Sequence, residues 1–305
     1  MSMISYYFAK DADVSGSWCR CVNSLPKRDR NFHSVLQCKC GEEKPIHKWN
    51  WEVDSQLSIP NVVLSNNNLD VLFHPTYSSG TAAVKGNLPL QQNVHHYWEI
   101  KILTNLYGTD VMIGVGTSRM VLSEWQLRFS SMLGCNRESW GFSYTGFIQH
   151  NCLTRSYGSC FTMGSLIGVY LDMWTGTLHY YLNRRPLGVA FTNVKKCDLY
   201  PMVCSTAAHS AMRITCSLSE PPSLQIDCLK LIAKYPTLVR QFWSIPGIAT
   251  MLEKKYFWLI PPLPVKSECK LELEDECVLS TKLINQHYEL QMRRRMDYLR
   301  NYLVS

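Results

Sequence analysis

The feature that most constrains the fold is a series of short segments in which apolar and polar residues alternate. In "YWEIKIL", Trp98, Ile100 and Ile102 point to one side of an extended chain, while Glu99 and Lys101 point to the other. This period of two predicts a half-buried β-strand. The same texture recurs between turn residues in "DVLFH", "VMIGVGT", "WGFSYTG", "SLIGVYLDM", "TLHYYLN" and "LYPMVCS". Because no helical periodicity separates these segments, we expect a mainly β chain folded as a β-sandwich.

One stretch predicts two consecutive hairpins. In "DMWTGTLHYYLNRRPLGV", Gly176 marks the first turn and the pair Asn183–Arg184 marks the second. Glycine and asparagine tolerate the positive backbone φ that tight hairpin turns require. We therefore expect three sequential antiparallel strands here.

The β pattern ends near Cys216, and a helical pattern replaces it after "SEPPS". Paired prolines cannot continue a strand ladder, and Ser223 is a favourable helix N-cap. Leu224, Cys228 and Ile232 then recur every four residues, which places them on one face of a helix. A later segment, "IATMLEKKYFWLI", predicts a helix that runs to Pro261, and the last twenty-odd residues predict a charged amphipathic helix.

These segments together resemble a known family. The stretches "HYWEIKI", "GTDVMIGVGTS", "ESWGFSYTG", "SLIGVYLDMWTGTLHYYLNRRPLGVA" and "LYPMVCSTAAHSAM" are similar to a SPRY domain over roughly residues 60 to 216. The helix that follows resembles a SOCS box, in which a leucine, a cysteine and an aliphatic residue are separated by three residues each. This order is that of the SPRY domain-containing SOCS box family.

The resemblance implies a SPRY-type β-sandwich followed by a small α-helical SOCS box, and a function without catalysis. The chain would be the substrate-recognition adaptor of an Elongin–cullin–RING E3 ubiquitin ligase, directing a bound substrate to ubiquitination and proteasomal degradation. The expected divisions are an irregular cysteine-containing segment at 1–47, the SPRY sandwich at 48–218, the SOCS box at 219–266 and a charged helix at 267–305.

The SOCS box resemblance implies two docking sites. Leu224, Cys228 and Ile232 would contact Elongin C, which in turn binds Elongin B; a cysteine suits a tight pocket because it is small and needs no hydrogen-bond partner. Pro262, Leu263 and Pro264 would contact a cullin, expected to be cullin-5 with its RING protein. Pro261 replaces a family leucine here, and the spacer before it is long. Two alternatives therefore stay open: a helix that only caps the sandwich, and a peptide-binding scaffold with a degenerate SOCS box.

The SPRY resemblance also implies a shallow site for a short asparagine-containing peptide, formed by loops at one end of the sandwich. Such a site pairs the amide with backbone groups, since an unpaired buried amide costs about 1–3 kcal/mol. The positions that match the family's binding loops are Tyr77, Gly108, Thr109, Phe129, Met132, Thr206 and Ala207. The alternative for each of them is ordinary loop packing.

The cysteines raise a separate question. There are 13 of them, an odd number, and most are isolated among apolar residues, which is typical of free thiols in a reducing compartment. "CRC" at 19–21 and "CKC" at 38–40, with His33 and His47 nearby, contain the residue types that bind zinc. Cys-x-Cys spacing is less diagnostic than Cys-x-x-Cys, so the sequence alone predicts neither a metal nor a cofactor.

Composition excludes several other classes. No nucleophile, zinc-protease or phosphate-loop motif is present, which argues against an enzyme. The net charge of +7 is modest and is spread along the chain. We therefore expect neither direct nucleic-acid binding nor a membrane partner, and a location in the cytoplasm, the nucleus or both.

Overall fold

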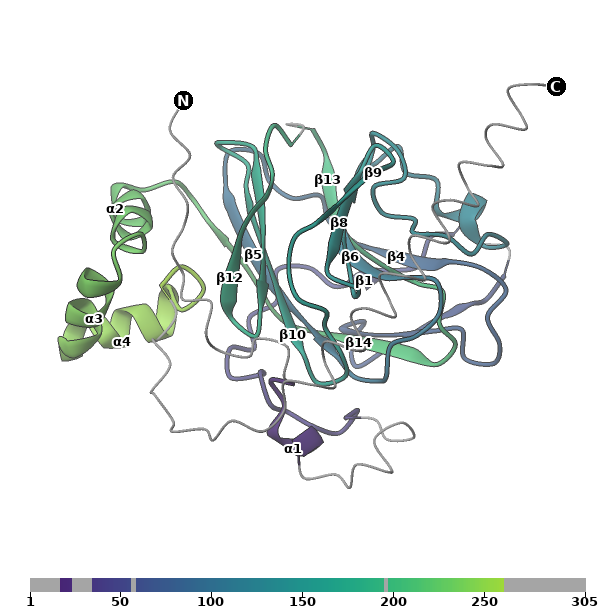
Figure 1. Cartoon of the computed structure of the whole chain (residues 1–305), viewed down its shortest axis with the longest axis horizontal. Coiled ribbons are helices and arrows are strands. Elements are labelled where there is room, and N and C mark those ends of the chain that lie inside the picture. Colours follow the sequence, from purple (N-terminus) through teal and green to yellow (C-terminus); the bar gives the residue numbers. More distant parts are fainter. Residues whose placement is uncertain (1–16, 24–34, 56–58, 195–196, 261–305) are drawn as a thin grey trace. The chain divides into compact units, whose positions relative to one another are not determined.

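The computed structural model describes residues 17–23, 35–55, 59–194 and 197–260 (Figure 1). The chain divides into two compact units, Met1–Pro262 and Leu263–Ser305, and all described residues belong to the first. The predicted cullin-binding residues Pro262, Leu263 and Pro264 and the predicted helix at 267–305 lie outside the described residues.

The predicted β-sandwich is confirmed: the strands form two seven-stranded antiparallel sheets that stack on each other (Figure 1). The first sheet has the order β1 (Trp51–Glu52), β4 (Ala82–Gly86), β13 (Leu199–Ser205), β6 (Val111–Thr117), β7 (Ser139–Ser143), β8 (Phe147–His150) and β9 (Leu153–Ser156). The second has the order β12 (Arg185–Phe191), β11 (Thr177–Leu182), β10 (Leu166–Asp172), β5 (His95–Ile102), β14 (Ser210–Glu220), β3 (Asp70–Phe73) and β2 (Val62–Ser65). A short 3-10 helix, η1 (Leu122–Trp125), follows β6.

The core lies between the sheets and is built from the alternating residues that the sequence indicated. Trp98, Ile100 and Ile102 of β5 are buried against Ile113 and Val115 of β6 within one large apolar cluster. Burying such side chains contributes roughly 1.5–3 kcal/mol each, which is the main term that stabilises a sandwich.

The two predicted hairpins are also confirmed. β10 pairs with β11, and β11 pairs with β12, both antiparallel. Asn183 and Arg184 have φ of 53° and 61°, and Gly176 has φ of 70°. Two consecutive positive φ values give a turn whose twist matches that of the flanking strands.

The prediction that β5 is half-buried is wrong, since all eight of its residues are buried. On the outward face, Glu99 accepts hydrogen bonds from the Tyr97 hydroxyl at 2.7 Å and from Arg184 Nε at 2.9 Å. Lys101 Nζ donates to the carbonyl oxygen of Cys38 at 2.8 Å. The hairpin residue Arg184 and the N-terminal segment at Cys38 therefore cover a face that the alternation assigned to solvent.

Three helices follow the sandwich, in keeping with a small helical box: α2 (Leu224–Ile232), α3 (Pro236–Ser244) and α4 (Pro246–Lys255). The predicted cap is confirmed, because the Ile226 backbone N–H donates to Ser223 Oγ at 3.3 Å. The helix predicted for "IATMLEKKYFWLI" is too long: α4 ends at Lys255, and the side chains of residues 256–260 are buried instead. The aromatic residues at its end pack on the sandwich, and that contact outweighs continuation of the helix. Among the described residues, every helix is too short or too polar to traverse a membrane.

Candidate functional site

Four loops meet at one end of the sandwich, and we call this surface the loop end: residues 77–81, 106–110, 126–132 and 206–209. Ser78 Oγ donates to the Thr206 carbonyl at 2.7 Å, and Thr81 Oγ1 donates to the Arg128 carbonyl at 2.6 Å. The Tyr107 hydroxyl donates to the Ala208 carbonyl at 2.5 Å. These bonds connect each loop to another, so the loop end is a single interlocked surface.

Two glycines allow the loop backbones to approach so closely. Gly108 has φ of +86°, and a Cβ added there would lie 2.9 Å from Thr206 Oγ1. A Cβ at Gly80 would collide with the Gln126 carbonyl. Only glycine fits both positions without displacing a neighbouring loop.

The structure places four of the predicted peptide-binding residues at the surface of the loop end. Tyr77 is 74% exposed and Phe129 is 56% exposed. Gly108 is exposed and Thr109 is half-buried. Large exposed aromatic side chains beside an accessible backbone are typical of a peptide-binding surface.

Two further loop-end residues were missed by the sequence reasoning. Tyr107 is 50% exposed, and Leu127 is 74% exposed. Tyr107 directly precedes the Gly108–Thr109 pair, so its position in the sequence was a usable signal. Leu127 carried none, because an apolar residue in a loop is indistinguishable from a core residue until the fold is known.

Three predicted contact residues are buried, which corrects their assignment. Met132 is fully buried in a cluster beside β6 and β13. Thr206 is 4% exposed, and its Oγ1 accepts from the Asp110 backbone N–H at 3.0 Å and donates to the Asp110 carbonyl at 3.1 Å. Ala207 is 1% exposed. In this structure their side chains position the loops and cannot touch a ligand at the surface.

Beneath the loop end lies a buried carboxyl group. Asp110 Oδ1 accepts hydrogen bonds from Ser143 Oγ at 2.6 Å and from the Val111 backbone N–H at 2.8 Å. Burial raises the pKa of Asp110 to about 6, although these hydrogen bonds act in the opposite direction. The loop end is therefore supported by a group that titrates just below neutral pH.

The second candidate surface is the outward face of α2. Leu224 is 80% exposed, Cys228 is exposed and Ile232 is half-buried. Ile226 and Leu229 on the opposite face are buried. The helix thus has two apolar faces, and the inward one already anchors it to the chain.

An ion pair ties α2 to the second sheet. Lys230 Nζ lies 2.9 Å from Asp172 Oδ2, and His95 Nδ1 lies 3.3 Å from Asp172 Oδ1. Burial acts to raise the pKa of Asp172, but hydrogen bonds from His95 and Lys230 hold it well below its usual range. This attachment fixes the orientation of the outward face.

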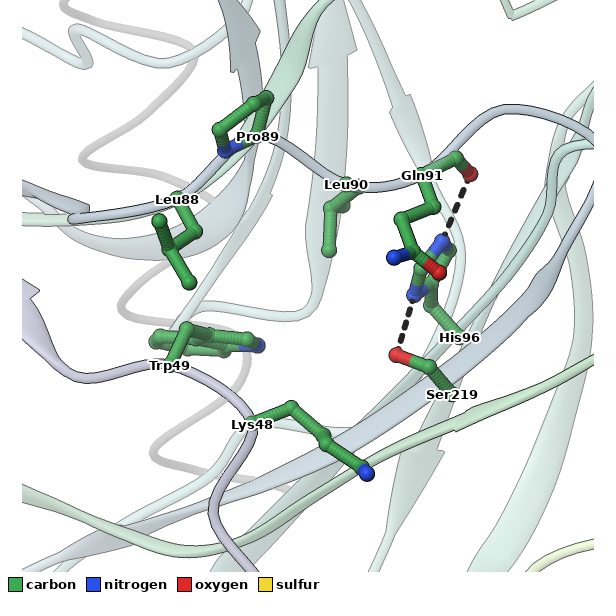
Figure 2. A pocket seen from close by; sticks show the side chains of 8 residues that line it. All are labelled: Lys48, Trp49, Leu88, Pro89, Leu90, Gln91, His96 and Ser219. Atoms are coloured by element: carbon green, nitrogen blue, oxygen red, sulfur yellow. Dashed lines mark hydrogen bonds between the residues drawn. The ribbon is translucent and has the colours of Figure 1, made fainter.

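A pocket of about 190 Å³ lies where β5 begins and β14 ends, and it is lined by Lys48, Trp49, Leu88, Pro89, Leu90, Gln91, His96 and Ser219 (Figure 2). One His96 ring nitrogen lies 2.9 Å from Ser219 Oγ, and the other lies 2.9 Å from the Gln91 carbonyl. Burial lowers the pKa of His96. With both ring nitrogens engaged and the ring kept neutral, this histidine is not arranged for acid–base catalysis, and no predicted site residue lines the pocket.

Comparison with known proteins identifies the domain to which this sandwich is similar. A family model for the SPRY domain matches residues 95–218. The SPRY domain of human HERC1, a solved structure, aligns with a TM-score of 0.40 and 20% identity, covering 50% of this chain and 91% of that chain. The predicted SPRY-type sandwich is confirmed by the match of the family model to residues 95–218.

The curated relatives extend the similarity beyond that domain. The chain is 42% identical over 233 residues to SPRY domain-containing SOCS box protein 3 of Xenopus tropicalis, covering 75% of this chain and 64% of the relative. It is 30% identical over 173 residues to Protein gustavus of Drosophila melanogaster, covering 53% and 60%. The chain thus spans somewhat less than two thirds of the length of these relatives. The predicted resemblance to the SPRY domain-containing SOCS box proteins is confirmed, and the similarity to protein 3 of that family extends over 75% of this chain.

Proposed function

We propose that the chain is a non-catalytic substrate-recognition adaptor of an Elongin–cullin–RING E3 ubiquitin ligase. The loop end would bind a short asparagine-containing peptide of the substrate, and the outward face of α2 would bind Elongin C and, through it, Elongin B. The name of the Xenopus tropicalis relative, which combines a SPRY domain with a SOCS box, supports this proposal. Holding both partners raises the effective concentration of substrate lysines near the ubiquitin-loaded enzyme, and this is the whole contribution of an adaptor.

The two-faced helix α2 is the observation that carries the proposal. Ile226 and Leu229 account for its packing on the rest of the chain. Leu224, Cys228 and Ile232 are not needed for that packing, yet they are apolar and accessible. An amphipathic helix with a spare apolar face is a common form of protein docking element.

The loop end fits the substrate part of the proposal. An asparagine side chain offers two N–H donors and one carbonyl acceptor, and the exposed backbone around Gly108 and Thr109 offers complementary groups. Tyr77, Tyr107 and Phe129 supply exposed aromatic surface around them. Substrate degradation by the proteasome, cullin-5 docking through Pro262, Leu263 and Pro264, and a cytoplasmic or nuclear location belong to the same proposal.

Co-expression with Elongin B and Elongin C, followed by size-exclusion chromatography, tests the proposal. We expect a stable ternary peak for the wild type and its loss in the double variant Leu224→Asp, Cys228→Asp. Both residues are exposed, so the double variant keeps the inward face of α2 and should fold. Leu153→Asp is the matched control, because Leu153 is 75% exposed on β9 of the other sheet.

A wild-type chain that elutes separately from the Elongins would favour the alternative function, a peptide-binding scaffold with a degenerate SOCS box. If instead the double variant still co-elutes, the docking face lies elsewhere on the chain. Peptide-array binding with asparagine-containing peptides, repeated on Thr109→Arg, tests the loop end independently of either result.

A further inference from the structure

Four thiols gather where the N-terminal segment crosses the second sheet. The sulfur atoms of Cys19, Cys21, Cys38 and Cys40, which we call the cysteine cluster, all lie within 4.8 Å of one another. The Sγ–Sγ distances are 3.0 Å for Cys19–Cys38, 3.4 Å for Cys21–Cys38 and 3.8 Å for Cys21–Cys40. Two Cys-x-Cys pairs with sixteen residues between them have therefore been brought to one point.

This arrangement matches a tetrathiolate metal site better than a pair of disulfides. A tetrahedral zinc ion bound at about 2.3 Å places its sulfur ligands roughly 3.8 Å apart. A disulfide joins two sulfurs at about 2.05 Å and needs exclusive pairs. Cys38 Sγ instead lies close to both Cys19 and Cys21, as expected of ligands that share a centre.

We infer that the cysteine cluster binds one structural Zn²⁺ ion, with each thiol losing its proton on binding. The four sulfurs complete the coordination shell, so neither His33 nor His47 is required. The inference replaces the expectation of no metal that Cys-x-Cys spacing alone had given. A closed shell of four protein ligands leaves no open position for a substrate, so the role of the ion is structural.

The surroundings of the cluster suit a metal thiolate. The Cys40 backbone N–H donates to Cys38 Sγ at 3.3 Å, which is the type of outer-shell hydrogen bond that orients a thiolate ligand. A zinc ion with four thiolates carries a net charge of about −2. Lys101, fully buried, and Arg213 both donate to the Cys38 carbonyl, at 2.8 Å and 3.4 Å, and so place positive charge beside it.

The described residues around the cluster form little apolar core of their own, so a bound metal ion would add stability that packing does not supply. The only described helix there, α1 (Arg20–Asn23), has four residues. Val22 and Val35 add a small cluster against Leu103, Met163 and Ala211 of the sandwich. Segments with so little core are commonly stabilised by a metal or by disulfides. The zinc ion would thus hold the N-terminal segment closed over the outward face of β5.

Metal analysis of the purified full-length chain by inductively coupled plasma mass spectrometry tests the inference. We expect about one zinc ion per chain, lost in Cys21→Ser and in Cys38→Ser. Cys21 is exposed, so its replacement by serine removes a ligand with little loss of packing. Cys152→Ser is the matched control, since Cys152 is an exposed thiol next to β9, and it should retain the zinc.

Three outcomes would overturn the inference. Native mass spectrometry could show a metal-free chain with four free thiols or with disulfides; iron could take the place of zinc; or Cys152→Ser could lose zinc as readily as Cys21→Ser. Cobalt substitution adds a positive readout, because four thiolates around Co²⁺ give the intense visible absorption of a tetrahedral site.

Discussion

Two segments cover the outward face of the second sheet, and they are held there by different chemistry. The N-terminal segment is fastened by charge: Arg184 pairs with Glu99 and Glu43, and Arg213 pairs with Asp70 and Glu42. The C-terminal segment is fastened by aromatic packing, with the Trp258 ring stacked 5.5 Å from Tyr97 and tilted 5.2 Å from Tyr170.

The two kinds of contact reflect two kinds of residue on the outward face of the single strand β5. Outward residues of β5 are an aromatic ring at Tyr97 and charges at Glu99 and Lys101, and all three are buried. Tyr97 packs against Trp258 of the C-terminal segment, and Lys101 donates a hydrogen bond to Cys38 of the N-terminal segment. A polar outward face is therefore no guarantee of exposure to solvent when distant segments carry matching groups.

The largest effect on stability should come from Arg184, whose ion pairs join it to Glu43 of the N-terminal segment and to Glu99 of β5. Arg184→Ala leaves Glu99, which is fully buried, without its cation, and removing one partner of a buried ion pair costs about 3–5 kcal/mol. We expect a loss of that size in the free energy of unfolding, measured by urea titration at neutral pH. Glu43→Gln is the control, because its side chain is 54% exposed and its pair with the same arginine should contribute no more than about 1 kcal/mol. Equal losses in the two variants would mean that the exposed pair with Glu43 contributes as much as the buried pair with Glu99, which contradicts the expected dependence on burial.

The next largest effect should come from Trp258, whose ring packs on Tyr97 and Tyr170 of the second sheet. Trp258 is 1% exposed, and replacing a buried tryptophan by alanine costs about 3 kcal/mol or somewhat more. We expect Trp258→Ala to increase hydrogen exchange in α2, α3 and α4 much more than in the sheets, because Trp258 attaches the helices to β5. Trp174→Ala, at a 60% exposed position, should change neither exchange nor stability by more than about 0.5 kcal/mol. Uniform loss of protection across sheets and helices would show that the helical segment is not a separate cover.

Local signals in the sequence account for what could be predicted. The hairpin turns at Gly176 and Asn183–Arg184 and the cap at Ser223 depend on residues that are neighbours in the chain. The inward residues of β5 follow from alternation alone. The burial of Glu99 and Lys101 could not be predicted, since their partners Arg184 and Cys38 lie 85 and 63 residues away.

The candidate sites divide in the same way. Tyr77, Gly108 and Phe129 reach the loop end because they occupy loop tips, which a family pattern locates well. Met132 occupies the same kind of loop, but its side chain is buried in the apolar cluster beside β6. Its burial depends on contacts with strands that are distant in the sequence. Cys-x-Cys pairs indicate thiol chemistry, but only the fold shows that two of them share one point.

Asp110 is a buried carboxyl group whose hydrogen-bond partners among the described residues are neutral, and this contrasts with the Arg184 partner of Glu99. The hydrogen bonds to Asp110 come from the neutral hydroxyl groups of Ser131 and Ser143 and from the Val111 N–H, and burial raises its pKa to about 6. A raised pKa means that the contribution to stability is present below the unfolded-state pKa of about 4 and is lost as the pH rises through about 6.

Asp110→Asn should therefore stabilise the chain by about 2 kcal/mol at about pH 7.5 and change little near pH 4. Asparagine keeps the acceptor oxygen that Ser143 and Val111 need. Thermal unfolding at the two pH values measures the difference. A variant that is destabilised at the higher pH would mean that Asp110 is held as a carboxylate despite its burial.

The smallest effect should come from the ion pair between Lys230 of α2 and Asp172 of β10, which links the helices to the sandwich beside a second ion pair, Lys255–Glu220. Lys230→Met removes a partly exposed cation from Asp172, which keeps His95 and the backbone N–H groups of Trp174 and Thr175, so we expect a cost of about 1 kcal/mol at neutral pH. The pKa of Asp172 is depressed, so its contribution is present above the unfolded-state pKa of about 4 and is lost as the pH falls further.

Hydrogen exchange of α2 at neutral pH measures this link, and exchange should be faster in Lys230→Met than in the wild type. Lys234→Met is the matched control, because Lys234 is exposed just past the end of the same helix. An effect of Lys234→Met as large as that of Lys230→Met would mean that general helix charge, and not the contact with Asp172, is what is being measured. An effect of Lys230→Met without an effect of Lys234→Met would show that the attachment of the helices depends on the ion pair with Asp172 as well as on aromatic packing. Asp172 on β10 would then help to set the orientation of the proposed Elongin-binding face.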